Sequence, residues 1–85
     1  MNSVFSQLIM KIIGEQENII GPLAVEQAKK IKGLKIDWLE RKIVITGDEK
    51  KIVKNLISQY EKIFGQASVE VCLGVINSMK IDLAT

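Results

Sequence analysis

A chain of 85 residues with one cysteine, no histidine and a net charge of +2 has room for one domain, and this composition excludes several classes of protein. Without histidine, neither a Ser-His-Asp nor a Cys-His catalytic arrangement can form within one chain, and one cysteine supplies too few ligands for a zinc site. The single cysteine also excludes an internal disulfide, and no apolar run approaches the ~20 residues that span a bilayer. We therefore expect a cytoplasmic protein with no signal peptide, no membrane span, no cofactor and no metal.

Residues 3–13 have the periodicity of an amphipathic helix. Ser3 is in the position of an N-cap, and Gly14 is expected to end the helix. Residues 15–18 are polar and form either a loop or a frayed continuation of the helix. The apolar residues fall at the spacing of one helical face: Phe5, Leu8, Ile9, Ile12 and Ile13.

A second helix is predicted from Gly21-Pro22 to about Lys32, with Gly33 as its stop. Proline suits the first turn of a helix, where its missing N–H has no partner within the helix. The predicted inner face is narrow, with small alanine side chains that allow close packing on the hairpin that follows. It consists of Leu23, Ala24, Ala28 and Ile31, with Gln27 at its edge.

Apolar and polar residues alternate over residues 34–47 in the pattern of a β-hairpin. A turn centred on Glu40-Arg41, or a four-residue loop over 39–42, predicts one register and gathers the large apolar side chains on one face. The other face is expected to be mostly polar. The predicted register sets Trp38 opposite Ile43, Ile36 opposite Ile45 and Leu34 opposite Gly47, with Lys35, Asp37, Val44 and Thr46 on the outer face.

The third helix is predicted to begin after an N-cap at Asp48 and to end at Gly65. A wide apolar stripe runs along it and is expected to face the core. The stripe consists of Ile52, Val53, Leu56, Ile57, Tyr60, Ile63 and Phe64.

The last segment, residues 68–80, fits two structures, and we favour a helix over a strand. Its β-branched residues are typical of a strand with Val69, Val71, Leu73 and Val75 on one face. The helical stripe is longer, and the segment ends in Asn77-Ser78-Met79-Lys80, which suits a strand poorly. Gly74 costs about 1 kcal/mol within a helix, so a close contact there would explain it. The helical face would hold Val69, Cys72, Leu73, Ile76 and Met79, with Val75 beside them.

These elements predict a small single α+β domain over residues 1–80, in the order α-α-β-β-α-α, followed by a loose tail over residues 81–85. The helices would cover one face of the hairpin at about 34–47. A two-stranded sheet is marginal by itself, and 47% of the residues are hydrophobic. Two copies could join hairpin edges into one sheet or pair through the first and last helices, so a homo-oligomer or a complex with another protein is expected.

Three apolar residues are candidates for an interface: Trp38, Leu39 and Val44. Tryptophan often anchors interfaces, although the predicted register turns Trp38 inward and favours a core residue covered by a helix. Leu39 follows it at the hairpin tip and is expected to point outward.

The middle of the chain is basic, with nine lysine and arginine residues against four acids between Lys29 and Lys54. The field is either a solvated face or a surface for an anionic partner such as nucleic acid. Aromatic residues for base stacking are scarce, and only one of the nine is arginine. The set consists of Lys29, Lys30, Lys32, Lys35, Arg41, Lys42, Lys50, Lys51 and Lys54.

Nothing in the sequence indicates an active site. Cys72 lies on an apolar stripe without an activating neighbour, which indicates a buried structural cysteine. The paired carboxylates are interleaved with lysines and indicate surface charge, and no convergence of polar groups indicates a ligand pocket. We therefore interpret the chain as a non-catalytic protein-protein interaction module, such as a self-associating scaffold, adaptor or regulatory subunit. The alternative is a nucleic-acid-binding accessory protein.

Overall fold

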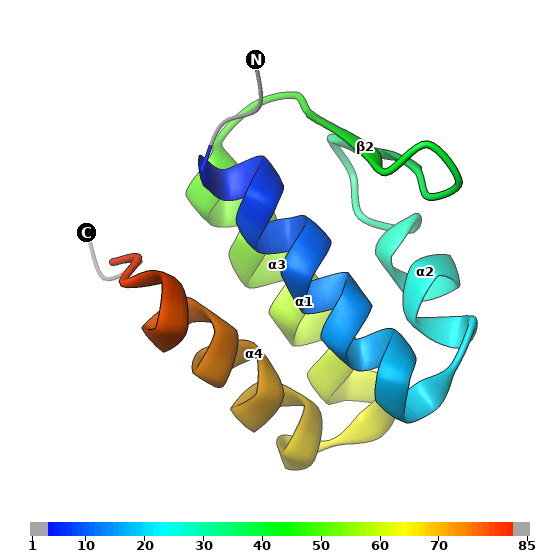
Figure 1. Cartoon of the computed structure of the whole chain (residues 1–85), viewed down its shortest axis with the longest axis vertical. Coiled ribbons are helices and arrows are strands. Elements are labelled where there is room, and N and C mark those ends of the chain that lie inside the picture. Colours follow the sequence, from blue (N-terminus) through cyan, green and yellow to red (C-terminus); the bar gives the residue numbers. More distant parts are fainter. Residues whose placement is uncertain (1–3, 83–85) are drawn as a thin grey trace.

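A computed structural model describes residues 4–82, and the order of elements within them confirms the predicted α+β fold (Figure 1). The helices are α1 (Val4–Ile20), α2 (Leu23–Ala28), α3 (Glu49–Phe64) and α4 (Gln66–Met79). The strands β1 (Leu34–Asp37) and β2 (Lys42–Ile45) form an antiparallel hairpin between α2 and α3.

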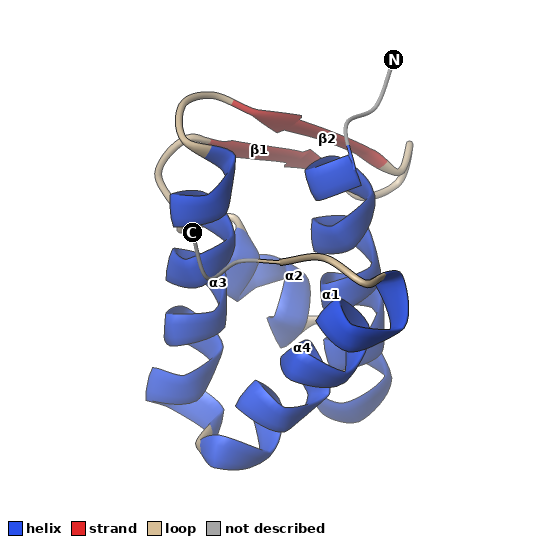
Figure 2. Ribbon diagram, turned by 90° about the vertical axis from the view of Figure 1, so that its left-hand side faces the viewer, coloured by secondary structure: helices blue, strands red, loops and turns tan. Residues whose placement is uncertain are grey.

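Helix α1 is the central element of the fold and contacts α2, α3, α4 and β2. In Figure 1 it crosses the front of the molecule with α3 behind it, while α4 lies on one side and α2 and the hairpin lie on the other. Figure 2 shows the hairpin across one end of the helices. One aliphatic core joins residues from all six elements, including Leu8, Ala24, Ile43, Leu56 and Cys72. None of the helices within residues 4–82 has both the length and the apolar character that crossing a bilayer requires.

Helix α1 is longer than predicted, and the stop at Gly14 is wrong. The helix continues to Ile20 and ends at Gly21, which has a φ of +71°. The physical reason is packing beyond the glycine: Gln16 is fully buried and Ile20 contacts the core. This burial outweighs the cost of about 1 kcal/mol for a glycine inside a helix. The predicted N-cap, Ser3, is outside the described residues.

Helix α2 is shorter than predicted, because the chain leaves the helix after Ala28 instead of at Lys32. Two 3₁₀-type hydrogen bonds follow, from the Lys30 N–H to the Gln27 carbonyl and from the Ile31 N–H to the Ala28 carbonyl. They tighten the chain so that it can reverse into β1. The predicted inner face is confirmed for Ala24, Ala28 and Ile31, whereas Leu23 is exposed. Gln27 is buried instead of lying at the edge, and its side-chain oxygen accepts a hydrogen bond from Gln59 at 2.8 Å.

The hairpin has the predicted faces but not the predicted register. Leu34 is opposite Ile45, Ile36 is opposite Ile43, and Asp37 is opposite Lys42. The pairing differs by two residues from the prediction, and an even shift leaves every side chain on its face.

The local bonds of the loop over 38–41 explain the observed register. The Arg41 N–H donates to the Trp38 carbonyl, the Glu40 N–H donates to Asp37 Oδ1, and Arg41 has a φ of +53°. Neither the turn centred on Glu40-Arg41 nor the loop over 39–42 is therefore present. At the other end, the Thr46 N–H donates to the Gly33 carbonyl at 2.7 Å and continues the ladder.

Helix α3 confirms its prediction at both ends. Asp48 Oδ1 accepts the Lys51 N–H at 3.2 Å as an N-cap, and Gly65 ends the helix. Most of the predicted apolar stripe is buried or contacts the core, whereas Ile63 is exposed.

The last segment is helix α4, as favoured over a strand. Cys72, Val75 and Ile76 are buried, while Leu73 is 47% exposed and does not belong to the inner face. The close contact predicted at Gly74 is absent among the described residues, since a Cβ there would have open space. Of the predicted tail at 81–85, Ile81 contacts the core and residues 83–85 are outside the described range.

Candidate functional site

The outer surface of the hairpin is the most prominent candidate for a functional site. We define this hairpin surface as Lys35, Asp37, Leu39, Lys42 and Val44, all of which are exposed. The alternation of the strands produces it, because Leu34, Ile36, Ile43 and Ile45 face the helices. Val44, 56% exposed, lies on this side opposite Lys35.

Leu39 is held outward by the bonds of the hairpin loop. It is 96% exposed, and its two neighbours in the loop, Trp38 and Glu40, are both fixed by hydrogen bonds. A single exposed leucine is ordinary on protein surfaces. Here Leu39 extends from the tip of a two-stranded hairpin that also exposes Val44, so apolar side chains are available at the tip and on the outer face.

Trp38 lies in the loop instead of the strand and is half-buried against the core. Its indole Nε1–H donates to Glu17 Oε2 at 3.2 Å, which ties the hairpin tip to α1. The Arg41 guanidinium covers the ring, 4.1 Å from its centroid. Of the three predicted interface residues, the structure exposes Leu39 and Val44 and engages Trp38 within the chain.

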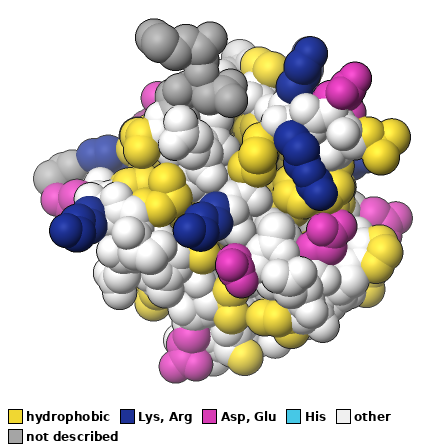
Figure 3. Space-filling model, viewed as in Figure 1, with side chains coloured by type: hydrophobic (Ala, Val, Ile, Leu, Met, Phe, Trp, Pro, Cys, Tyr) yellow, Lys and Arg dark blue, Asp and Glu magenta, His cyan; other side chains and the backbone are white. Residues whose placement is uncertain are grey.

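A shallow groove separates the hairpin tip from α1. Its volume is about 490 Å³, and Trp38, Arg41, Gly14 and Lys11 are among its lining residues. On the face that α1 crosses, Figure 3 shows separate groups of hydrophobic side chains with basic and acidic side chains between them. Such a mixed surface offers no concentrated charge to a ligand.

Members of the predicted basic set lie at both ends of the hairpin. Lys32 and Lys51 come together, because both line a groove of about 400 Å³ with Asp48. Arg41 is at the opposite end of the hairpin, on the Trp38 ring. The structure therefore does not gather the nine residues into one patch, although all are at least partly exposed.

A buried polar cluster lies between α1 and α4. The Gln16 side chain is fully buried, and its Nε2 donates to the Ser68 carbonyl at 2.9 Å and to Cys72 Sγ at 3.5 Å. Its Oε1 has no partner among the described residues. The sequence contained a signal for this position, because Gln16 continues the helical spacing of Ile9, Ile12 and Ile13.

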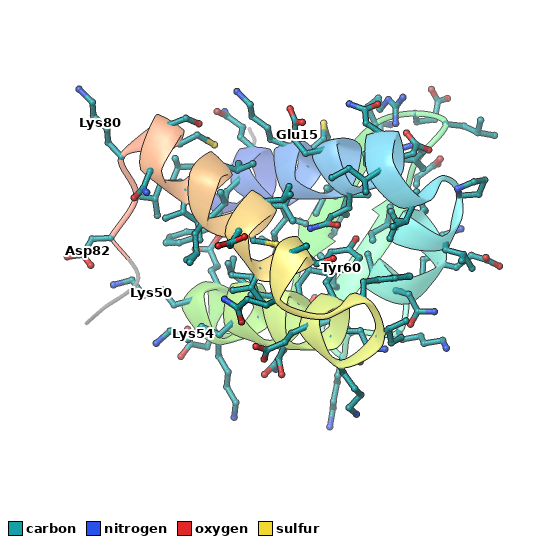
Figure 4. All side chains as sticks on the ribbon, turned by 90° about the horizontal axis from the view of Figure 1, so that it is seen from below. Glu15, Lys50, Lys54, Tyr60, Lys80 and Asp82 are labelled. Carbon is teal, nitrogen blue, oxygen red and sulfur yellow. The ribbon has the colours of Figure 1, made fainter. Side chains whose placement is uncertain are left out.

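The titratable groups in the interior are held neutral. Burial raises the pKa of the Cys72 thiol, although the hydrogen bond from Gln16 opposes the shift. Burial and the nearby Cys72 raise the pKa of Tyr60, whose hydroxyl donates to the Ala24 carbonyl at 2.7 Å. Figure 4 shows Tyr60 in the interior, whereas Lys54 and Glu15 are at the periphery. A buried, protonated thiol is a poor nucleophile, so this cluster has the properties of a core.

No group of three acidic or cysteine side chains within residues 4–82 comes together as a metal site. The hairpin surface and the two grooves are thus the features from which a function can be argued. Comparisons of the chain with protein-family models, curated proteins and solved structures gave no match.

Proposed function

We propose that this protein is a non-catalytic protein-protein interaction module of the cytoplasm that self-associates through its hairpin surface. The observation that carries the proposal is the exposure of Leu39 and Val44 on the outer side of a two-stranded sheet. A scaffold, adaptor or regulatory subunit needs such a surface and no catalytic group.

The architecture of the hairpin supports this role. Its inner face rests on the helices through Leu34 and Ile43, and Trp38 ties its tip to α1. The outer face is therefore presented by a fixed element, which lowers the entropy cost of binding. Fully burying a valine or leucine side chain contributes about 1.5–3 kcal/mol, so two such residues can drive a weak association.

The test compares the variants Leu39→Asp and Val44→Asp with the wild type by light scattering after size exclusion. We expect each variant to raise the dissociation constant of the assembly by about tenfold or more, because a carboxylate would be buried at the contact. Circular dichroism should show an unchanged fold, since neither side chain supports the core. Leu73→Asp is the matched control, because Leu73 is similarly exposed but lies on α4. Equal assembly in all four proteins would count against the hairpin surface.

Nucleic-acid binding is the second candidate, favoured by the meeting of Lys32 and Lys51 at one groove. Its affinity should fall steeply with salt, because counterion release drives such binding. The engagement of Trp38 by Arg41 and Glu17 argues against base stacking on this residue. Oligonucleotide titrations at low and high salt distinguish the two candidates, and salt-dependent binding by a monomer would favour the second.

A further inference from the structure

The groove between the hairpin tip and α1 has one wall from the hairpin loop and a floor from the helix. The loop contributes Trp38 and Arg41, and α1 contributes Met10 and Gly14 among others. Two contacts hold the loop side in place: the bond from the Trp38 indole to Glu17 and the Arg41 guanidinium over the ring. The groove, of about 490 Å³, is therefore formed by fixed elements.

Gly14 keeps the floor of this groove open. The other α1 residues that line the groove lie about one turn before and one turn after it, so Gly14 is at the centre of this helical face. A glycine within a helix is less stable than an alanine, yet a Cβ at Gly14 would meet no atom within 4 Å. No contact among residues 4–82 thus requires a glycine here, whereas an occupant of the groove would.

Leu39 provides an apolar side chain directly beside the groove. It follows Trp38 in the chain but is 96% exposed and is not among the lining residues, so it does not fill the groove of its own chain. A projecting side chain and a recess therefore lie next to each other at the hairpin tip. A two-fold rotation places each of them against the other in a second copy, and such an interface closes as a dimer.

We propose that Leu39 of one copy enters the groove of a second copy and that the partner's Leu39 enters the groove of the first. This inference rests on the proposed function and specifies the surface that receives the hairpin tip. The leucine side chain lies over Gly14 and between the apolar parts of Met10 and Trp38. Each dimer removes two exposed leucines from water, which favours association.

Charge complementarity supports a second copy as the occupant and sets its direction. Glu40 follows Leu39 and is exposed, and Lys11 is exposed and lines the groove. With Leu39 inserted, Glu40 lies at the rim within reach of the partner's Lys11, and this pair occurs twice. Glu15 lines the groove one turn further along α1, so the tip crosses the helix with Glu40 toward Lys11 and away from Glu15.

The variant Gly14→Gln tests the insertion. Its side chain would occupy the recess, so we expect the dissociation constant of the dimer to rise about tenfold or more, as measured by light scattering. The dilute, monomeric variant should be at least as stable to urea as the wild type, because glutamine favours a helix over glycine. Gly74→Gln is the matched control, because a Cβ at this α4 glycine would also have open space but faces a separate groove. Equal dissociation constants for the two variants would overturn the proposal.

A mixing experiment tests the charge pair. Glu40→Lys and Lys11→Glu each set like charges together in a homodimer, whereas a heterodimer of the two variants restores both pairs. We expect native mass spectrometry of the mixture to show heterodimers beyond the statistical fraction. Lys54→Glu replaces Lys11→Glu as the control, because it makes the same charge change at an exposed position on α3. An equal heterodimer fraction in the two mixtures would overturn the proposal.

The outcomes separate this inference from the proposed function. Assembly that is weakened by Leu39→Asp but indifferent to Gly14→Gln would retain the hairpin surface as the interface and overturn the insertion into the groove. A wild-type protein that stays monomeric would overturn both.

Discussion

At the scale of single residues, the interior depends on a few polar side chains placed among aliphatic ones. Gln16 connects α1 to α4, and Tyr60 connects α3 to α2 through the Ala24 carbonyl. Buried polar groups with specific partners fix the relative positions of the helices more narrowly than aliphatic contacts do. Cys72, between them, is part of the same cluster.

The neutral state of Tyr60 and Cys72 predicts a loss of stability at alkaline pH. Burial raises both pKa values in the folded protein, so the unfolded chain releases these protons at lower pH than the folded one. The stabilising contribution of both groups is therefore fully present below about pH 9, where an exposed thiol ionises. It falls as the pH rises above this value, and falls more steeply above about pH 10, where an exposed tyrosine also ionises. Each group contributes at most about 1.4 kcal/mol per pH unit. Urea unfolding from pH 7 to pH 11 measures this slope.

A pair of substitutions provides the control for that slope. The double variant Tyr60→Phe/Cys72→Ala should lose much of the alkaline destabilisation, because neither replacement titrates. At pH 7 the Tyr60→Phe change alone should cost about 1–2 kcal/mol, through the lost bond to the Ala24 carbonyl. An identical alkaline slope in the wild type and the double variant would contradict the assignment.

Residue-scale features were predictable where the signal was local. The Asp48 N-cap follows from its place after Gly47 and before an amphipathic stripe, and the cap is present. The burial of Gln16 does not follow from its polarity, because a polar residue normally interrupts an apolar face, although its spacing continues that face. The hydrogen bond from Trp38 to Glu17 joins residues 21 positions apart, so no local pattern could indicate it.

At the scale of elements, the hairpin shows what alternation can and cannot determine. The period of two predicted the faces correctly, but any even shift of register satisfies the same pattern. The observed register depends on the loop over 38–41 and on Gly33 at the other end. Gly33 has a φ of +85°, and a Cβ there would lie 2.5 Å from the Thr46 carbonyl oxygen.

Gly33→Ala should therefore destabilise the protein by at least about 2 kcal/mol, through the unfavourable φ and the clash with Thr46. Gly21→Ala is the control, because its φ is +71° and a Cβ there would have open space. It should cost only the conformational part, about 1–2 kcal/mol. Chemical denaturation gives both values, and equal costs would mean that the close approach at Gly33 does not constrain the hairpin.

The helices illustrate how tertiary packing overrides local preference. Gly14 did not stop α1, because residues beyond it are buried against the core. The β-branched residues of the last segment do not make it a strand, because its apolar side chains reach the core from one face of helix α4. Both outcomes agree with the rule that most helical stability in proteins comes from burial of one face.

At the scale of the whole molecule, the order of elements and the two-stranded hairpin followed from sequence periodicity, because each segment was long enough to show its period. The arrangement around α1 did not, since it depends on contacts between distant segments. The candidate site was predicted in part: Leu39 and Val44 point outward as alternation implies, whereas the basic set is dispersed by the fold.

The proposed function concerns the assembled molecule, because the hairpin surface would act only by contacting another chain. The most direct test is the molar mass of the wild-type protein by light scattering, over about a hundredfold range of concentration. We expect the mass to rise with concentration from that of the 9.5 kDa chain toward twice that value. A mass that stays at 9.5 kDa over the whole range would contradict self-association.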